Sequence, residues 1–142
     1  MVDAYWDSSA LVPLCLKQQA TPVVQALRVK YRLAVWWSAC VEVRGAIARL
    51  NRIGFLTPNE QVQAQVALDR MLPDCLEVLP TEQLREQAMR LVDRFPLKAA
   101  DAFQLAAAII WCLGHPAGRA FISGDIHLLE AARQLGFDAI QA

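Results

Sequence analysis

The stretch YWDSSALVPL, residues 5–14, joins a strand-like segment to a helix-like one through a single carboxylate. The pattern of residues 2–6 predicts a short strand, and Asp7 stands where that strand ends. Ser8 or Ser9 can cap the helix that follows, which leaves Asp7 available for another task. The carboxylate at this junction is therefore either a cap itself or part of a functional site.

The rest of the chain repeats this alternation of short apolar strands and helices. Further strands are predicted at residues 33–37, 75–80, 119–123 and 137–141, the last at a sheet edge. Helices are predicted from a cap at Thr21, then over 38–54, 58–71, 81–95, 97–114 and 125–136, with 97–114 apolar on nearly every face. The pattern predicts an α/β fold: a parallel sheet of four to five strands, with helices on both faces. Residues 1–142 are expected to form a single domain.

Composition narrows the classes of function. The chain has 14 basic and 14 acidic residues, so its formal net charge is zero, and any nucleic-acid binding needs local charge separation. The 56% apolar content suggests an apolar interface in addition to a core. The start of the chain lacks the pattern of a signal peptide, and the most apolar segment is too short to span a bilayer. We therefore expect a cytoplasmic protein without a membrane partner.

The cysteines do not predict a zinc site. None of the four forms a C-x-x-C pair, and only two histidines could join them. Their apolar surroundings favour small buried residues in a reducing compartment. The cysteines are Cys15, Cys40, Cys75 and Cys112.

Four carboxylates are predicted to face one edge of the sheet. Asp7 and Asp125 follow strands, Glu42 lies one turn into the helix after the second strand, and Asp101 lies in the first turn of the apolar helix. In open α/β sheets, ligands bind at the carboxyl ends of the strands. We therefore expect all four side chains to face one crevice.

Each of these carboxylates also has a plain structural interpretation. Any of them could stabilise a helix N-terminus, and Asp7 or Asp125 could be a cap. Ser38 is expected to cap the helix that contains Glu42; the two residues resemble a capping box, but their spacing is one residue too long. Asp101 stands among alanines and large apolar side chains, where an unpaired charge is costly. Four such acids at one sheet edge favour a functional site.

Converging carboxylates repel one another unless a cation lies between them. Mg²⁺ prefers oxygen ligands and is usually held by a few carboxylates together with substrate phosphate. Such a site can hydrolyse a phosphodiester. Neither a G-x-x-x-x-G-K nor a G-x-G-x-x-G phosphate loop is present.

In these acids and the residues around them, the sequence resembles the PIN-domain nucleases, and among them the VapC-type toxins of type II toxin–antitoxin systems. The resemblance rests on four stretches in family order: YWDSSALVPL, WWSACVEVRGAIARL, LKAADAFQLAAA and FISGDIHLLEAARQLG. It implies strand order 3-2-1-4-5 and endoribonuclease activity that depends on Mg²⁺ or Mn²⁺. It also implies a cognate antitoxin protein as partner and a homodimer.

The resemblance assigns roles to individual positions. It implies that the acids Asp7, Glu42, Asp101 and Asp125 hold the metal and carry catalysis. Hydroxyls at Ser8 or Ser9 and at Ser123 would support them. Gln104 departs from the pattern, since many relatives carry histidine there; this leaves substrate preference open.

RNA contacts would come from arginines. Arg44 and Arg49, with Arg52, lie on the Glu42 helix, and Arg85, Arg90 and Arg94 lie on another. Their alternative interpretation is a solvated helix face.

Other functions stay open from the sequence. The chain could be a non-catalytic PIN-like binding module, with Trp36 and Trp37 at an interface, although these tryptophans could equally be core residues. It could also be a PIN nuclease with a role in RNA processing. A phosphatase or receiver domain ranks lower, because the D-x-D signature and the pair of adjacent acids are both missing.

Overall fold

The computed structural model describes residues 1–16 and 22–142. The predicted cap Thr21 lies outside the described residues. The strands are β1 (Val2–Trp6), β2 (Tyr31–Trp36), β3 (Leu76–Val78), β4 (Ala120–Ser123) and β5 (Asp138–Gln141). The helices are α1 (Ser8–Cys15), α2 (Pro22–Lys30), α3 (Ala39–Arg52), α4 (Pro58–Met71), the short 3₁₀ helix η1 (Leu72–Asp74), α5 (Glu82–Arg94), α6 (Ala99–Trp111) and α7 (Ile126–Leu135).

Within the described residues, five parallel strands form one sheet in the order β3-β2-β1-β4-β5. β1 lies at the centre, and Tyr5 is in register with Ala34 of β2 and Phe121 of β4. The predicted α/β class, the strand order and the edge position of residues 137–141 are confirmed.

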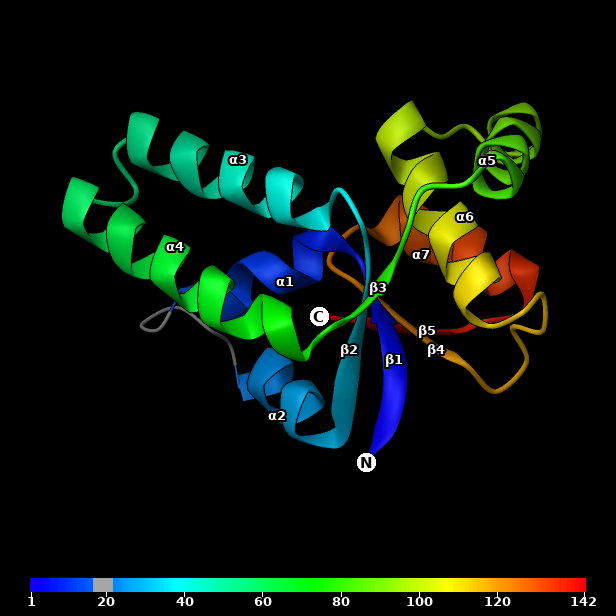
Figure 1. Cartoon of the computed structure of the whole chain (residues 1–142), viewed down its shortest axis with the longest axis horizontal. Coiled ribbons are helices and arrows are strands. Elements are labelled where there is room, and N and C mark those ends of the chain that lie inside the picture. The colour runs from blue at the N-terminus through cyan, green and yellow to red at the C-terminus, as the bar shows by residue number, and fades with distance from the viewer. Residues whose placement is uncertain (17–21) are drawn as a thin grey trace.

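Helices cover both faces of this sheet. Tyr5 packs with α5, α6 and α7 on one face, whereas its neighbours Ala4 and Trp6 pack with α1, α3 and α4 on the other. Figure 1 shows these two helical layers on opposite sides of the strands. Central parallel strands have no solvent face, which explains why β1 carries large apolar side chains toward both layers.

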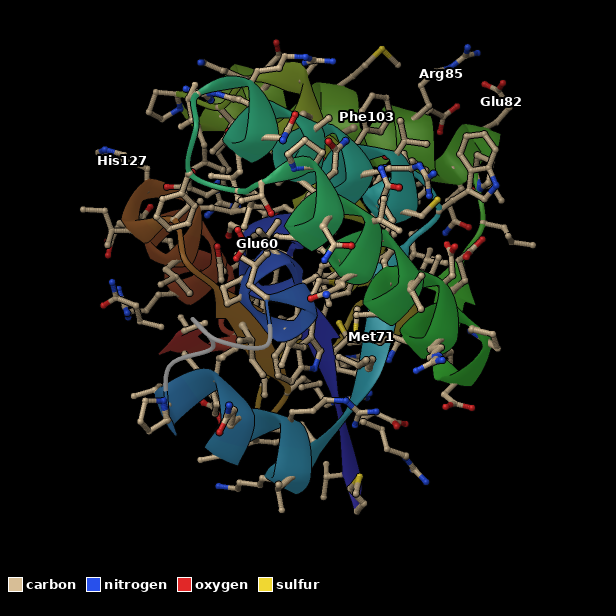
Figure 2. All side chains as sticks on the ribbon, turned by 90° about the vertical axis from the view of Figure 1, so that its left-hand side faces the viewer. Glu60, Met71, Glu82, Arg85, Phe103 and His127 are labelled. Carbon is tan, nitrogen blue, oxygen red and sulfur yellow. The ribbon has the colours of Figure 1, made fainter. Side chains whose placement is uncertain are left out.

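The α3–α4 hairpin forms the outer part of one layer. The turn uses Gly54, whose φ of 82° suits a residue without a side chain. Thr57 and Glu60 then form a capping box that starts α4. Figure 2 shows α4 running across this face, from near the labelled Glu60 to Met71. The hairpin holds α3, and with it Glu42, against α1.

The other layer follows the sequence pattern closely. Thr81 caps α5 through the amide of Leu84, and α7 ends at Gly136 in the left-handed conformation. The predicted apolar helix is α6, in which six of thirteen residues are buried, among them the run from Gln104 to Ala108. Even so, no helix in residues 1–16 or 22–142 is long and apolar enough to cross a membrane.

Candidate functional site

The carboxyl ends of β1 and β4 bring Asp7 beside Ser123. The amide of Asp7 donates to the carbonyl of Ile122 at 2.9 Å, which continues the pairing of the two strands beyond Trp6. The side chain of Asp7 is buried, with 5% of its surface exposed. A carboxylate therefore lies almost out of solvent at the end of the central strand.

Two serine hydroxyls hold this carboxylate in place. Ser9 and Ser123 both donate to Oδ2 of Asp7, the latter at 2.8 Å. The amide of Gly124 donates to Ser9 Oγ at 2.9 Å, and the amide of Asp125 donates to Ser123 Oγ at 3.0 Å. These backbone contacts orient both hydroxyls toward Asp7, so its position is fixed from two strand–helix junctions.

Burial raises the pKa of Asp7 above its ordinary value of 3.8. Hydrogen bonds from the side chains of Ser9 and Ser123, and from the backbone of Ser9 and Ser8, oppose this rise. In the described part of the chain, Asp7 forms no ion pair. The unfavourable free energy of burying the charge of Asp7 is thus offset by hydrogen bonds from neutral groups alone.

Glu42 lies in the first turn of α3 and is half-buried. Its Oε2 accepts hydrogen bonds from Ser38 Oγ at 2.9 Å and from Gln104 Nε2 at 3.2 Å. Burial raises the pKa of Glu42, and the charge of Asp7 raises it further, against the hydrogen bonds from Ser38, Gln104 and Ser8. The charges of Glu42 and Asp7 thus influence each other.

Gln104 is a site residue whose contacts the sequence interpretation missed. Its side chain is 1% exposed, accepts from Tyr5 Oη at 2.6 Å, and donates to Ser8 Oγ at 2.7 Å as well as to Glu42. Gln104, where the sequence departs from the family pattern, therefore belongs to the hydrogen-bond network that supports Glu42. A glutamine inside an apolar helix carries the same signal as Asp101, because a buried polar side chain requires partners.

Asp101 and Asp125 extend the group of acids. Burial raises the pKa of Asp101, and the charges of Asp125 and then Asp7 raise it further, while Lys98 lowers it. Asp125 Oδ1 accepts from the amides of His127 and Leu128 and so caps α7. The structural interpretation of Asp125 as a cap is therefore correct, although its charge also affects Asp101.

Capping by the serines was predicted wrongly. Asp7 occupies the N-cap position of α1, and Ser8 and Ser9 lie inside the helix with their hydroxyls directed at other side chains. Ser38 occupies the N-cap position of α3, but it makes no cap hydrogen bond and donates to Glu42 instead. In both places a carboxylate attracts the hydroxyl away from the helix amides.

The donor set fits a hard divalent cation. We use "the carboxylate site" for Asp7, Glu42, Asp101 and Asp125. These acids supply oxygen ligands, influence one another electrostatically, and form no ion pairs within the described residues. Across residues 1–16 and 22–142, however, no three acidic, histidine or cysteine side chains are gathered closely enough to bind a metal directly. Mg²⁺ usually keeps several waters and is held by one or two carboxylates together with substrate phosphate, not by a closed cage of protein ligands.

The arginines are divided between exposed positions and local contacts. Arg44 lies 3.8 Å from Asp69, and Arg85 pairs with Glu82. Arg49 and Arg52 are exposed in the last turn of α3, away from Glu42 in its first turn. Arg90 bonds to Gln87, and Arg94 lies over the ring of Phe95. These contacts favour the solvated-face interpretation for Arg85, Arg90 and Arg94.

The tryptophan pair is split between the core and the surface. Trp36 is 6% exposed and belongs to the core beneath α6, whereas Trp37 is 50% exposed. The core interpretation holds for Trp36 only. Cys15 and Cys112 are buried as predicted, while Cys40 and Cys75 are half-buried; all four are free thiols.

Fold and side chains together define an α/β protein with several partly desolvated acids at the carboxyl ends of its strands. No family model and no curated protein matches the sequence. Solved structures do share the fold. The structure of PAE2754 from Pyrobaculum aerophilum is 22% identical over 99% of this chain and 89% of its own, with a TM-score of 0.68.

Two further structures show the same likeness. FitAcB from Neisseria gonorrhoeae is 14% identical over 96% of each chain, with a TM-score of 0.65. A toxin–antitoxin complex from Klebsiella pneumoniae is 14% identical over 87% of each chain, with a TM-score of 0.59. At this level of identity, the likeness establishes a common fold.

Proposed function

We propose that this protein is a metal-dependent endoribonuclease that acts as the toxin of a toxin–antitoxin pair. The observation that carries the proposal is Asp7: a buried carboxylate at the end of the central strand, held by two hydroxyls, without a cationic partner in the described residues. Carboxylates whose pKa is raised by burial cluster at functional sites.

In this proposal, Asp7, Glu42 and Asp101 hold Mg²⁺ or Mn²⁺ directly or through water, and Asp125 completes the site. When bound, the cation polarises a phosphodiester and lowers the pKa of the attacking water. Ser9 and Ser123 keep Asp7 oriented, and Gln104 with Ser38 keeps Glu42 oriented. Ser8, which bonds to Gln104, belongs to the same supporting layer.

The toxin role rests on the fold and on the sequence resemblance together. One structure that shares the fold is a toxin–antitoxin complex from Klebsiella pneumoniae. By analogy, we propose a small antitoxin protein as partner and a homodimer as the assembled form. The apolar content of 56% is compatible with both interfaces.

Cleavage of unstructured RNA by purified protein tests the enzyme directly. We expect cleavage with Mg²⁺ or Mn²⁺, inhibition by EDTA, and loss of at least a hundredfold in rate in Asp7→Asn and Asp101→Asn. Asp93→Asn removes an exposed acid of α5 and should cleave like the wild type. Retained cleavage in Asp7→Asn would remove Asp7 from the mechanism.

Induced expression in a bacterial host tests the toxin role. Expression of the wild type should halt growth, whereas Asp7→Asn should not. A short open reading frame next to the gene, whose product restores growth, would identify the antitoxin. RNA cleavage without growth arrest would favour a role in RNA processing.

A non-catalytic binding module is the second candidate. It is favoured by the spacing of the acids, since no three of them are close enough to bind a metal directly in the described chain. It is also favoured by the exposed Trp37. Absence of cleavage of any RNA with either metal, combined with stable binding of a partner protein, would select this function.

A further inference from the structure

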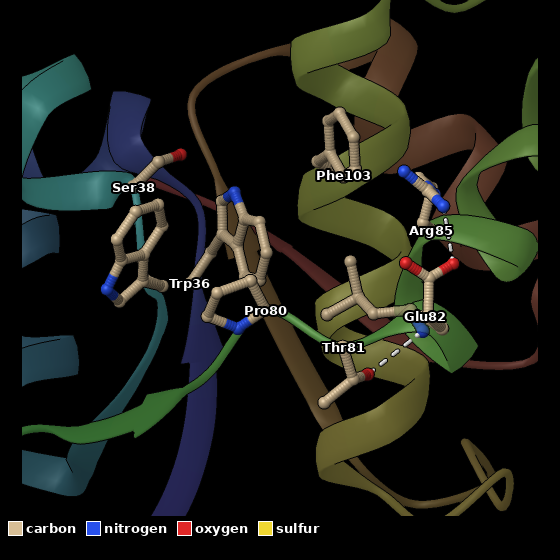
Figure 3. Close-up of a pocket in the computed structure, with 9 residues that line it drawn as sticks. Trp36, Ser38, Pro80, Thr81, Glu82, Arg85 and Phe103 are labelled. Atoms are coloured by element: carbon tan, nitrogen blue, oxygen red, sulfur yellow. Dashed lines mark hydrogen bonds and ion pairs between the residues drawn. The ribbon is translucent and has the colours of Figure 1, made fainter.

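A groove of about 660 Å³ lies on the α6 side of the sheet, beyond the end of β2. Figure 3 shows its wall, where Trp36, Phe103 and Ser38 face the start of α5. Aromatic and other apolar atoms form most of this wall, and Thr81 and Arg85 provide polar atoms. The groove thus combines a flat apolar surface with hydrogen-bonding groups.

Trp37 is the most accessible aromatic side chain of this groove. Half of its surface is exposed, yet its amide donates to the carbonyl of Val78 at 3.0 Å. Its ring meets that of Trp36 edge to face, with centroids 6.5 Å apart and planes at 67°. Trp36 in turn stacks on Phe103 at 5.8 Å and 8°. The exposed indole of Trp37 therefore packs against the buried ring of Trp36, which in turn stacks on Phe103.

The groove adjoins the carboxylate site. Ser38 lines the groove and donates to Glu42 Oε2 at 2.9 Å. Phe103 lies on α6, between Asp101 and Gln104 in the sequence. Asp101 belongs to the carboxylate site, and Gln104 bonds to Glu42. A ligand that fills this groove would therefore lie next to Ser38, which bonds to an acid of the carboxylate site.

The far rim supplies polar groups. Thr81 Oγ1 accepts from the amide of Leu84 at 3.1 Å, and within the described residues no acceptor takes its hydroxyl proton. Arg85 and Glu82 form an exposed ion pair beside it. The hydroxyl of Thr81 can donate to the edge of a planar heterocycle, and the carboxylate of Glu82 can accept from it.

We propose that this groove binds one unpaired nucleobase of single-stranded RNA, stacked on the indole of Trp37, next to the phosphodiester at the carboxylate site. This inference rests on the proposed nuclease function. An exposed indole that packs on a buried ring beside hydrogen-bonding side chains matches the way proteins bind unstacked bases. The groove would thus influence which nucleotide stands beside the cleaved bond.

Binding of a labelled RNA tests the inference. The probe is a fluorescein-labelled, unstructured single-stranded RNA, and the measurement is fluorescence anisotropy with Mg²⁺ in the Asp7→Asn background, where cleavage is blocked. Stacking on an aromatic side chain predicts that Trp37→Ala weakens binding by about tenfold. Trp37→Phe keeps an aromatic face and should retain most of the affinity. Phe55→Ala removes a similarly exposed aromatic ring outside the groove and should bind like the parent.

Cleavage kinetics give an independent readout. In the otherwise unmodified enzyme, Trp37→Ala should raise KM by about the same factor as it weakens binding, because the base contact is lost in the ground state as well. It should also change the preference for the nucleotide beside the cleaved bond. Circular dichroism checks that each variant is folded.

The possible outcomes distinguish a failure of this inference from a failure of the proposed nuclease function. If Trp37→Ala binds and cleaves RNA like the wild type, the base site is wrong and the nuclease stands. If that variant keeps RNA binding but loses a partner protein, the groove belongs to the partner and the inference is also wrong. If the wild type neither binds nor cleaves RNA, the proposed function fails, and the inference fails with it.

Discussion

Tyr5 and Gln104 share a buried hydrogen bond of 2.6 Å, although one lies in β1 and the other in α6. Because the phenol donates to Oε1, the amide nitrogen of Gln104 is turned toward Ser8 and Glu42. The orientation of an acid in the carboxylate site is thus linked to a tyrosine in the core of the opposite layer.

Gln104→Leu tests this link. The substitution leaves the buried hydroxyl of Tyr5 without an acceptor, which should lower the free energy of unfolding by about 1–3 kcal/mol. It also removes a donor from Glu42, so RNA cleavage should fall. Urea denaturation and cleavage rates measure the two effects.

The double variant Tyr5→Phe with Gln104→Leu is the matched control. It removes both partners, so its loss of stability should be smaller than the sum of the two single losses. Its cleavage should stay as low as that of Gln104→Leu, because the donor to Glu42 is still missing. Additive losses of stability would show that the two side chains are not coupled.

The pKa shifts predict how stability depends on pH in metal-free buffer. Burial raises the pKa values of Asp7, Glu42 and Asp101, so the folded state holds protons that the unfolded state has already lost. The stabilisation that follows from these groups is complete below their ordinary pKa values and is lost as the pH rises through the raised ones.

Asp7→Asn should flatten this dependence, because one of the three shifted groups no longer titrates. Urea midpoints measured between about pH 4 and pH 7 would show the difference from the wild type. Asp93→Asn, on the exposed face of α5, should keep the wild-type slope. Equal slopes for all three proteins would show that Asp7 is not desolvated in solution.

Addition of Mg²⁺ should stabilise the folded protein. A cation at a hundred times its Kd adds about 2.7 kcal/mol to the free energy of unfolding, which corresponds to a rise of several degrees in Tm. Asp7→Asn and Asp101→Asn should lose most of this rise, and potassium chloride at the same ionic strength should not reproduce it. A Tm that does not respond to Mg²⁺ or Mn²⁺ in the wild type would speak against the metal site, whatever the cleavage assay shows.

Asp125 has two separable tasks, a cap for α7 and an acid of the carboxylate site. Asp125→Ala should cost about 1 kcal/mol through loss of the cap, whereas Asp125→Ser should restore most of that stability. If Asp125 also supports catalysis, cleavage should stay low in both variants. Full cleavage in Asp125→Ser would reduce its role to the cap.

Sequence patterns predicted the fold well because its determinants are local. The short apolar run of β1, the Thr57 and Thr81 caps, and the glycine after α7 can each be recognised within a few residues. Strand order, in contrast, is not a local property. The resemblance implied it, and the pairing of the strands in the sheet confirmed it.

The side-chain network was harder to predict, since it depends on which residues meet across the fold. Ser8, Ser9 and Ser38 were expected to cap helices, as serines before helices commonly do. Ser8 instead bonds to Gln104, which only the tertiary structure brings near. Ser9 and Ser38 bond to the neighbouring acids Asp7 and Glu42 rather than to helix amides. A rule that treats every polar side chain in an apolar helix as a network member would have found Gln104.

The central place of β1 in the sheet has a consequence for synthesis on the ribosome. Asp7 emerges 116 positions before Ser123, which holds it. Until β4 has been translated, β1 has one unpaired edge and Asp7 lacks half of its hydroxyl partners. Contacts this distant along the chain also form slowly. A nascent chain therefore cannot assemble its acids in their final arrangement until β4 and the start of α7 have been made.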